Sequence, residues 1–130
     1  MKFVRNALFG LMALTILPCL ALIGLANRGA PPLPEVADLD PGAWRIGYAA
    51  MRDGRPEVAY DHLRRVPPDH PEYARAMRYC AWNVLANDLD RPKAAVAYVH
   101  ESLRTDPFDD NVWEDLWRVY VRSALPFVDV

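Results

Sequence analysis

The segment Glu101–Trp113 reads ESLRTDPFDDNVW and contains the end of one helix, a turn and the start of the next. Pro107 cannot continue a helix, because its ring removes a backbone donor and clashes with the preceding turn. Asp109 and Asp110 then stand where a helix can begin, since the helix dipole favours carboxylates in the first turn. The segment therefore predicts one helix that ends before Pro107 and another that runs from Asp109 or Asp110 to Ala124.

The same signals recur upstream of this segment. Pro56, Pro71 and Pro92 each stand where a helix can begin, because proline in the first helical position loses no hydrogen bond. Asp40 is a candidate N-cap, and Gly54 can adopt the left-handed conformation that closes a helix. These signals predict an all-α domain over residues 41–125, followed by a tail of residues 126–130. The expected helices before Pro107 cover residues 43–52, 56–65, 71–86 and 92–105.

The chain also contains an internal repeat, because a shift of 36 residues aligns its prolines and small residues. The aligned positions are Ile46-Gly47 with Trp82-Asn83, Ala50 with Ala86, Arg55-Pro56 with Arg91-Pro92, Ala59 with Ala95, Leu63 with Val99 and Pro71 with Pro107. Two copies of a helix–turn–helix unit with such a period are typical of repeat proteins, whose units bury a common core by stacking.

This pattern resembles the tetratricopeptide repeat, a 34-residue helix pair with ordered bulky, Leu, Gly, aromatic, Ala, Phe and Pro positions. The first copy matches it at Ile46, Gly47, Gly54, Ala59, Leu63 and Pro71. The second copy matches it at Tyr79, Trp82, Ala95, Val99, Ser102 and Pro107. The last helix resembles the opening of a third unit through Trp113, Leu116, Trp117 and Tyr120.

The resemblance covers residues 40–124 and implies a short right-handed α-solenoid of two helix pairs and a capping helix. It implies that Trp82, Trp113 and Trp117 pack between helices. The chain departs from the family pattern where Asn83 and Trp117 replace the small glycine and where two extra residues separate the copies. So short an array has fewer units than the three that repeat proteins normally need, which points to support from a partner.

The N-terminal region contains an uncharged run from Ala7 to Ala26. At about 1.5 Å per residue, a helix of this length spans the roughly 30 Å hydrocarbon core of a bilayer. Lys2 and Arg5 precede the run, and the positive-inside rule places such a flank in the cytoplasm. We therefore expect residues 1–27 to anchor the chain in a bacterial inner membrane by a single span, with the C-terminal domain in the periplasm.

A cleaved signal peptide is the alternative interpretation of this run. Its apolar part is usually about 7–15 residues long, which is shorter than the run here, but Gly24 and Ala26 fit cleavage after Ala26. A lipoprotein signal is disfavoured, because Pro18 rather than a small residue precedes Cys19. Cys19 and Cys80 would lie too far apart for a disulfide, so we expect both to be small apolar filling residues.

Residues 28–40 form a linker rich in proline and acidic residues. Pro31, Pro32 and Pro34 favour an extended polyproline conformation, so we expect a semi-rigid stalk that lifts the domain off the bilayer. The whole chain has a net charge of −2, and the part beyond residue 27 holds 13 basic and 17 acidic side chains. A mildly acidic domain of this kind lacks the basic footprint of a nucleic-acid-binding protein.

No group of residues has the spacing of a catalytic or metal site. His62, His70 and His100 match no catalytic motif, and we expect His62 and His100 to be solvated residues on the outer helices. No cofactor, metal or small-molecule substrate is therefore expected, and binding is favoured over catalysis. The alternating oxygen ligands and the glycine of a calcium loop are missing from the acidic cluster of Asp109, Asp110, Glu114 and Asp115.

Aromatic and charged residues recur on the first helix of each unit, which in the resembled family faces a concave groove. Trp44 with flanking arginines is typical of an interface hot spot. The predicted partner-binding groove comprises Trp44, Tyr48, Met51, Arg52, Val84, Asp88, Glu114, Arg118 and Arg122. Alternatively, the linker covers this stripe in cis through Leu33 or Val36.

The sequence thus predicts a membrane-anchored scaffold for protein–protein interaction, an accessory or assembly subunit of a larger inner-membrane complex. Its expected partners are other proteins, chiefly integral-membrane subunits, bound through the groove, the membrane helix or both. A soluble periplasmic adaptor released after Ala26 is the alternative.

Overall fold

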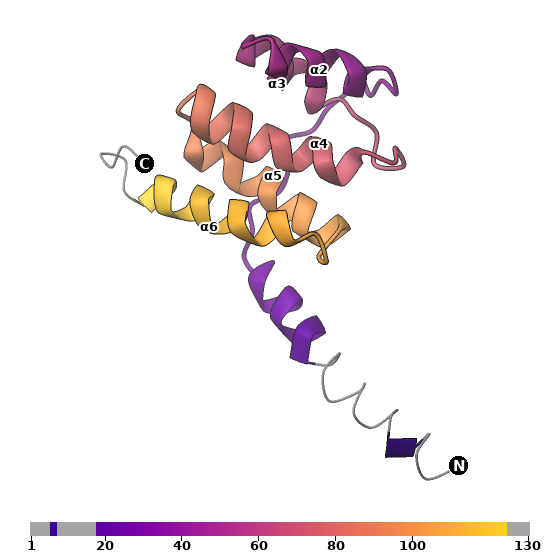
Figure 1. The fold of residues 1–130 in the computed structure, drawn as a ribbon, viewed down its shortest axis with the longest axis vertical. Coiled ribbons are helices and arrows are strands. Elements are labelled where there is room, and N and C mark those ends of the chain that lie inside the picture. Colours follow the sequence, from indigo (N-terminus) through magenta and orange to yellow (C-terminus); the bar gives the residue numbers. More distant parts are fainter. Residues whose placement is uncertain (1–5, 8–17, 125–130) are drawn as a thin grey trace.

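The fold of the computed structural model consists of helices joined by short turns (Figure 1). The structure describes residues 6–7 and 18–124, and helices are the only regular secondary structure within them. The predicted all-α class is therefore confirmed for this part of the chain. In chain order the named elements are α2 (Ala43–Arg52), α3 (Pro56–Leu63), α4 (Tyr73–Tyr79), the π-helical segment η1 (Cys80–Asp88), α5 (Pro92–Thr105) and α6 (Asp110–Ala124).

The helix boundaries follow the prolines and glycine that the sequence singles out. Pro56 and Pro92 lie in the first turns of α3 and α5, and Gly54 closes α2 with a φ of +71°. Contrary to the prediction, Asp40 is not the N-cap of α2, but it supports the turn just before that helix. Its carboxylate accepts a hydrogen bond of 2.9 Å from the backbone N–H of Gly42, and Gly42 itself is the N-cap of α2.

Helix α4 continues directly into η1, so the two form one helix whose second half is wider than an α-helix. At its end the N–H of Leu89 donates to the carbonyl of Val84 over 2.9 Å, five residues back, as in a π-helix. The 3.6-residue period of the sequence does not predict this widening. The buried side chains of the π-helical segment are Cys80, Ala81, Val84, Leu85 and Ala86.

Successive helices pack closely because small residues lie at their crossings. A Cβ atom at Gly47 of α2 would lie 2.8 Å from Cγ of Leu63 on α3, so only glycine permits this approach. Ala59 of α3 and Ala95 of α5 are both fully buried. Helix α5 packs in turn against α4, η1 and α6.

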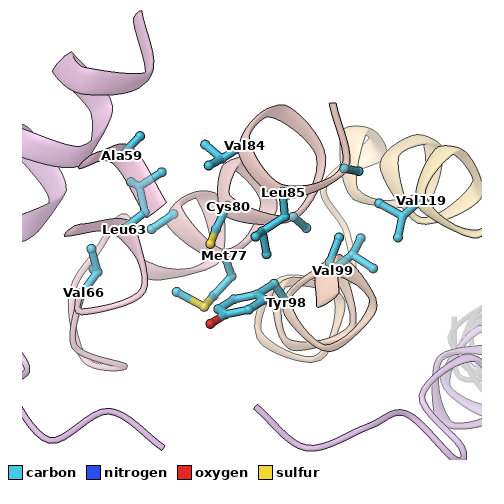
Figure 2. Close-up of a cluster of buried hydrophobic side chains, with 14 of the residues drawn as sticks. Ala59, Leu63, Val66, Met77, Cys80, Val84, Leu85, Tyr98, Val99 and Val119 are labelled. Atoms are coloured by element: carbon cyan, nitrogen blue, oxygen red, sulfur yellow. The ribbon is translucent and has the colours of Figure 1, made fainter. Parts of the chain in front are cut away.

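One apolar core joins these helices (Figure 2). Met77, Cys80 and Leu85 of the α4–η1 helix meet Val99 of α5, and Val119 of α6 closes the cluster. Cys80 is fully buried, and this burial raises the pKa of its thiol, which therefore remains neutral. The prediction that Cys80 is a small apolar filling residue is confirmed.

The linker lies along the helical domain instead of extending away from it. The guanidinium of Arg65 donates to the carbonyl of Asp38 over 3.0 Å, and the N–H of Asp40 donates to the carbonyl of Arg65 over 2.9 Å. Leu33 packs against the core, and with Val36 it lines a cavity of about 150 Å³ over α3, α4 and α5. The linker backbone is extended, as predicted. The expectation of a free stalk is wrong, because the linker packs against the helical domain.

Residues 18–26 are helical and precede the linker, and we call them the 18–26 helix. Its apolar side chains are open, with exposed fractions of 53% for Leu20 and 61% for both Leu22 and Leu25. The predicted membrane span Ala7–Ala26 includes residues 8–17, which lie outside the described residues. Within the described ranges, no helix is both long enough and apolar enough to cross a bilayer.

Candidate functional site

Three aromatic rings from two helices form one stack at the surface. Trp44 and Tyr48 of α2 lie with ring centroids 5.2 Å apart, and Tyr79 of α4 lies 6.2 Å from Trp44 and 5.9 Å from Tyr48. All three side chains are half-buried. The sequence places Trp44 and Tyr48 on one stripe, and the structure adds Tyr79 to them.

Arginine side chains lie over the rings of this stack and over a neighbouring tryptophan. The guanidinium carbon of Arg52 is 5.9 Å from the ring centre of Tyr48, and that of Arg78 is 4.8 Å from the ring centre of Tyr79. A third contact joins Arg118 of α6 to Trp82 of η1 at 5.5 Å. At these distances the cation is attracted to the face of the ring. We call this surface the aromatic–arginine face; it comprises Trp44, Tyr48, Arg52, Arg78, Tyr79, Trp82 and Arg118.

One buried and one half-buried carboxylate hold two of these arginines in place. Asp115 of α6, whose side chain is 4% exposed, lies 3.1 Å from Nη1 of Arg78 and 3.3 Å from Nη1 of Arg118. Asp109 lies 3.4 Å from Nε of Arg78. Burial raises the pKa of Asp115, and the two guanidiniums oppose that rise. The network links α4 to α6 and fixes where the positive charges lie.

The sequence missed Asp115 and Arg78 as parts of the site. Asp115 belongs to an acidic cluster that the helix dipole explains adequately, and Arg78 has no distinctive spacing. The next residue, Tyr79, matches the repeat pattern, but nothing in that pattern singles out Arg78.

The remaining residues of the predicted groove are not all exposed at the surface of the domain. The prediction for Val84 is wrong, because Val84 is fully buried on the core side of η1. Met51 is half-buried and packs against the core. Asp88 is exposed, Glu114 forms an ion pair with Arg118, and Arg122 lies 3.3 Å from Asp90.

The linker leaves the aromatic–arginine face uncovered. Leu33 and Val36 line a cavity with Tyr73, Met77 and Tyr98, which is a different set of residues from those of the face. The alternative in which the linker fills the predicted groove in cis is therefore wrong for the described residues.

His100 is buried, which corrects the expectation of a solvated histidine. Its side chain lies between two polar partners, with Nε2 2.6 Å from the hydroxyl of Tyr120 and Nδ1 3.1 Å from Oδ1 of Asn27. The amide of Asn27 also donates to the carbonyl of Ile23 over 3.1 Å. Burial lowers the pKa of His100, so the ring is neutral. His100 thereby joins the end of the 18–26 helix to α5 and α6.

Two of the three tryptophans expected between helices are instead at the surface. Trp82 is half-buried and packs against the core, but Trp113 is 37% exposed and Trp117 is 71% exposed. In the pattern of the resembled family, Trp117 takes the glycine position that Gly47 holds in the first copy, and Leu63 of α3 packs over Gly47. No described helix follows α6 to cover the corresponding side, so the prediction for Trp113 and Trp117 is wrong.

Comparison with models of protein families, with curated proteins and with solved structures finds no match to this chain. Residues 6–7 and 18–124 contain no group of three or more histidine, cysteine, aspartate or glutamate side chains that could hold a metal ion. The chemistry available at the aromatic–arginine face is that of binding: ring faces, guanidinium donors and a fixed charge network.

Proposed function

We propose that this chain is a membrane-anchored module for protein–protein interaction, an accessory or assembly subunit of a larger bacterial inner-membrane complex. Its helical domain is a short tetratricopeptide-like right-handed solenoid of two helix pairs and a capping helix. Residues 7–26 cross the membrane once, with the N-terminus in the cytoplasm and the domain in the periplasm. The aromatic–arginine face binds the partner protein, and no catalysis is involved.

The observation that carries this proposal is the stack of Trp44, Tyr48 and Tyr79 beneath charged guanidiniums. Binding hot spots are enriched in tryptophan, tyrosine and arginine, which provide large contact area with few rotatable bonds. The rings support one another, and Asp115 holds Arg78 and Arg118, so little side-chain freedom is left to lose on binding. A preordered surface of this composition suits a partner that carries carboxylates around an apolar side chain.

Purification in mild detergent from native membranes tests the face. Trp44→Ala should release the co-purifying partner, because an anchor residue contributes about 2 kcal/mol or more, which is roughly thirty-fold in affinity. Val58→Ala is the matched control, since Val58 is a 37% exposed apolar residue on α3, outside the face. Retention of the partner by the Trp44 variant, with its helical signal intact, would refute binding through this face.

A chimaera with an unrelated membrane span in place of residues 7–26 tests the other binding element. If the face carries the association, the chimaera keeps its partner and Trp44→Ala loses it. The reverse result assigns the association to the membrane helix. Resistance to alkaline extraction tests the anchor itself, and a mature N-terminus at Asn27 would instead establish the cleaved, soluble adaptor.

A further inference from the structure

The outer side of α6 carries a row of exposed aromatic side chains. Trp113, Trp117 and Tyr120 are spaced four and three residues apart, so they lie on one side of the helix, and Phe108 precedes them in the turn from α5. Their exposed fractions are 37%, 71% and 43%, and that of Phe108 is 77%. So many large apolar side chains in one place mark a contact surface.

This row is continuous with the exposed helix at the N-terminal side of the domain. A cleft of about 700 Å³ lies between them, with Leu22 and Leu25 of the 18–26 helix on one wall and Phe108 and Trp113 on the other. Figure 1 shows the 18–26 helix directly beneath α6, while α2 and α3 lie at the far end of the molecule. The apolar surface therefore extends from the 18–26 helix onto α6.

Hydrogen bonds fix the distance between these two elements. Asn27, which follows the 18–26 helix, contacts Nδ1 of His100, and the opposite ring nitrogen of His100 contacts the hydroxyl of Tyr120. Ala26 packs against the core of the domain. No spacer therefore separates the end of the uncharged N-terminal run from the aromatic row on α6.

We infer that the outer side of α6 rests on the bilayer surface, with Phe108, Trp113 and Trp117 at the boundary between lipid headgroups and acyl chains. This inference rests on the proposed membrane anchor. If residues 7–26 span the bilayer, Ala26 lies at its surface, and Tyr120 lies within two hydrogen bonds of Asn27. Tryptophan and tyrosine are enriched at this depth, because an apolar ring and a polar N–H or O–H suit the interface.

The outer side of α6 enters the bilayer no deeper than the boundary between headgroups and acyl chains. Asp110 also lines the cleft, and its carboxylate is exposed, so it requires the water of the headgroup region. The indole N–H of Trp113 is already bonded to the carbonyl of Pro107 over 2.9 Å, which leaves its ring suited to apolar surroundings. With α6 on the membrane and a single span beside it, the domain cannot rotate about its anchor. The aromatic–arginine residues of α2 are then presented away from the bilayer.

Quenching of tryptophan fluorescence by brominated lipids tests this inference on the full-length protein. The protein is reconstituted in vesicles of phosphatidylethanolamine and phosphatidylglycerol, with and without bromine on the acyl chains. One variant keeps only Trp117 (Trp44→Phe, Trp82→Phe, Trp113→Phe), and its matched control keeps only Trp44 (Trp82→Phe, Trp113→Phe, Trp117→Phe). We expect brominated vesicles to reduce the emission of Trp117 and to leave that of Trp44 unchanged.

The outcomes separate this inference from the proposed function. Protein that floats with the vesicles while Trp117 stays unquenched overturns the inference and leaves the anchor standing. Protein that does not float with the vesicles refutes the anchor, and the inference falls with it. Quenching that disappears at high protein density assigns the row to a second copy of the chain and also overturns the inference.

If the triple variants lose their helical signal, single substitutions in the natural background replace them. Trp117→Phe should then lower the fraction of emission that brominated lipid quenches, and Trp44→Phe should raise it. Equal quenched fractions in these two variants would overturn the inference.

Discussion

Buried polar side chains determine how neighbouring helices of this domain are aligned. A charged or polar group without water must find a partner inside the protein, so each such contact fixes one helix relative to another. Asp115 does this between α4 and α6 through Arg78, and the hydroxyl of Ser102 does it by donating to the carbonyl of Ala74 over 2.8 Å. His100 does the same between the N-terminal segment, α5 and α6.

The buried His100 should make the domain sensitive to acid. Its pKa is lowered from 6.5 by burial, so the unfolded chain binds more protons than the folded one as the pH falls through 6.5. The free energy of unfolding should therefore be highest above pH 6.5, should fall between this pH and the lower pKa of the folded state, and should level off below that pKa. In His100→Gln this loss should be smaller, as measured by thermal unfolding of the detergent-solubilised protein between about pH 5 and 8.

His62→Gln is the control, because the same substitution is made outside the hydrogen bonds of Asn27 and Tyr120. A reduced loss in His100→Gln that is not seen in His62→Gln would assign the acid sensitivity to His100. Parallel profiles for wild type and His100→Gln would show that the acid sensitivity arises elsewhere.

At the scale of elements, local signals predicted the helices well. Pro56 and Pro92 fit a helix only in its first turn, and Gly54 has the positive φ that other residues avoid. These positions therefore determine helix boundaries without tertiary information. The widened η1 carries no local signal of this kind. A π-helical turn depends on what the surrounding helices bury, and that is decided by packing.

The errors at the site have the same origin. Trp113 and Trp117 stand where a further helix would cover them, but whether one exists depends on the whole molecule and not on their spacing. Val84 lies in the core because it falls on the same side of the helix as Met77, Cys80 and Ala81, and its assignment to the groove rested on the resemblance and not on this spacing. The stacking of Trp44 on Tyr79 joins residues of two units, which no pattern within one helix predicts.

Tryptophans on neighbouring elements should differ in their effect on stability. Trp82→Ala removes a half-buried ring that packs against the core and lies against Arg118, so it should cost less than the roughly 3–5 kcal/mol of a fully buried tryptophan but well over 1 kcal/mol. Trp117→Ala should change the free energy of unfolding by no more than about 0.5 kcal/mol, because the side chain is 71% exposed. Urea unfolding followed by circular dichroism measures both. Equal losses would mean that a segment of the chain or a second copy covers α6.

At the scale of the whole molecule, the linker connects the two ends of the domain. It starts at the His100 contact near α6, passes over α5 and α4 at Leu33, and reaches Arg65 at the end of α3 before α2 begins. The helical domain thus gains apolar contact from its own linker. The sequence identified the extended backbone of the linker but not the surface on which it lies, since polyproline segments have no internal hydrogen bonds that direct them.

Removal of the linker should therefore weaken the domain. A fragment of residues 27–130 should be soluble and helical, and it should be more stable than a fragment of residues 41–130 by about 2 kcal/mol. This estimate combines about 1 kcal/mol for the partial burial of Leu33 with two hydrogen bonds between the linker and Arg65, at roughly 0.5 kcal/mol each. Urea unfolding of both fragments gives the difference.

Leu33→Ser in the longer fragment should remove part of this difference in the free energy of unfolding, whereas Glu35→Ala, at an exposed position, should not. Equal stability of the two fragments would mean that the linker is a free stalk in solution, in which case the domain could move relative to its anchor and α6 would not be held at the membrane.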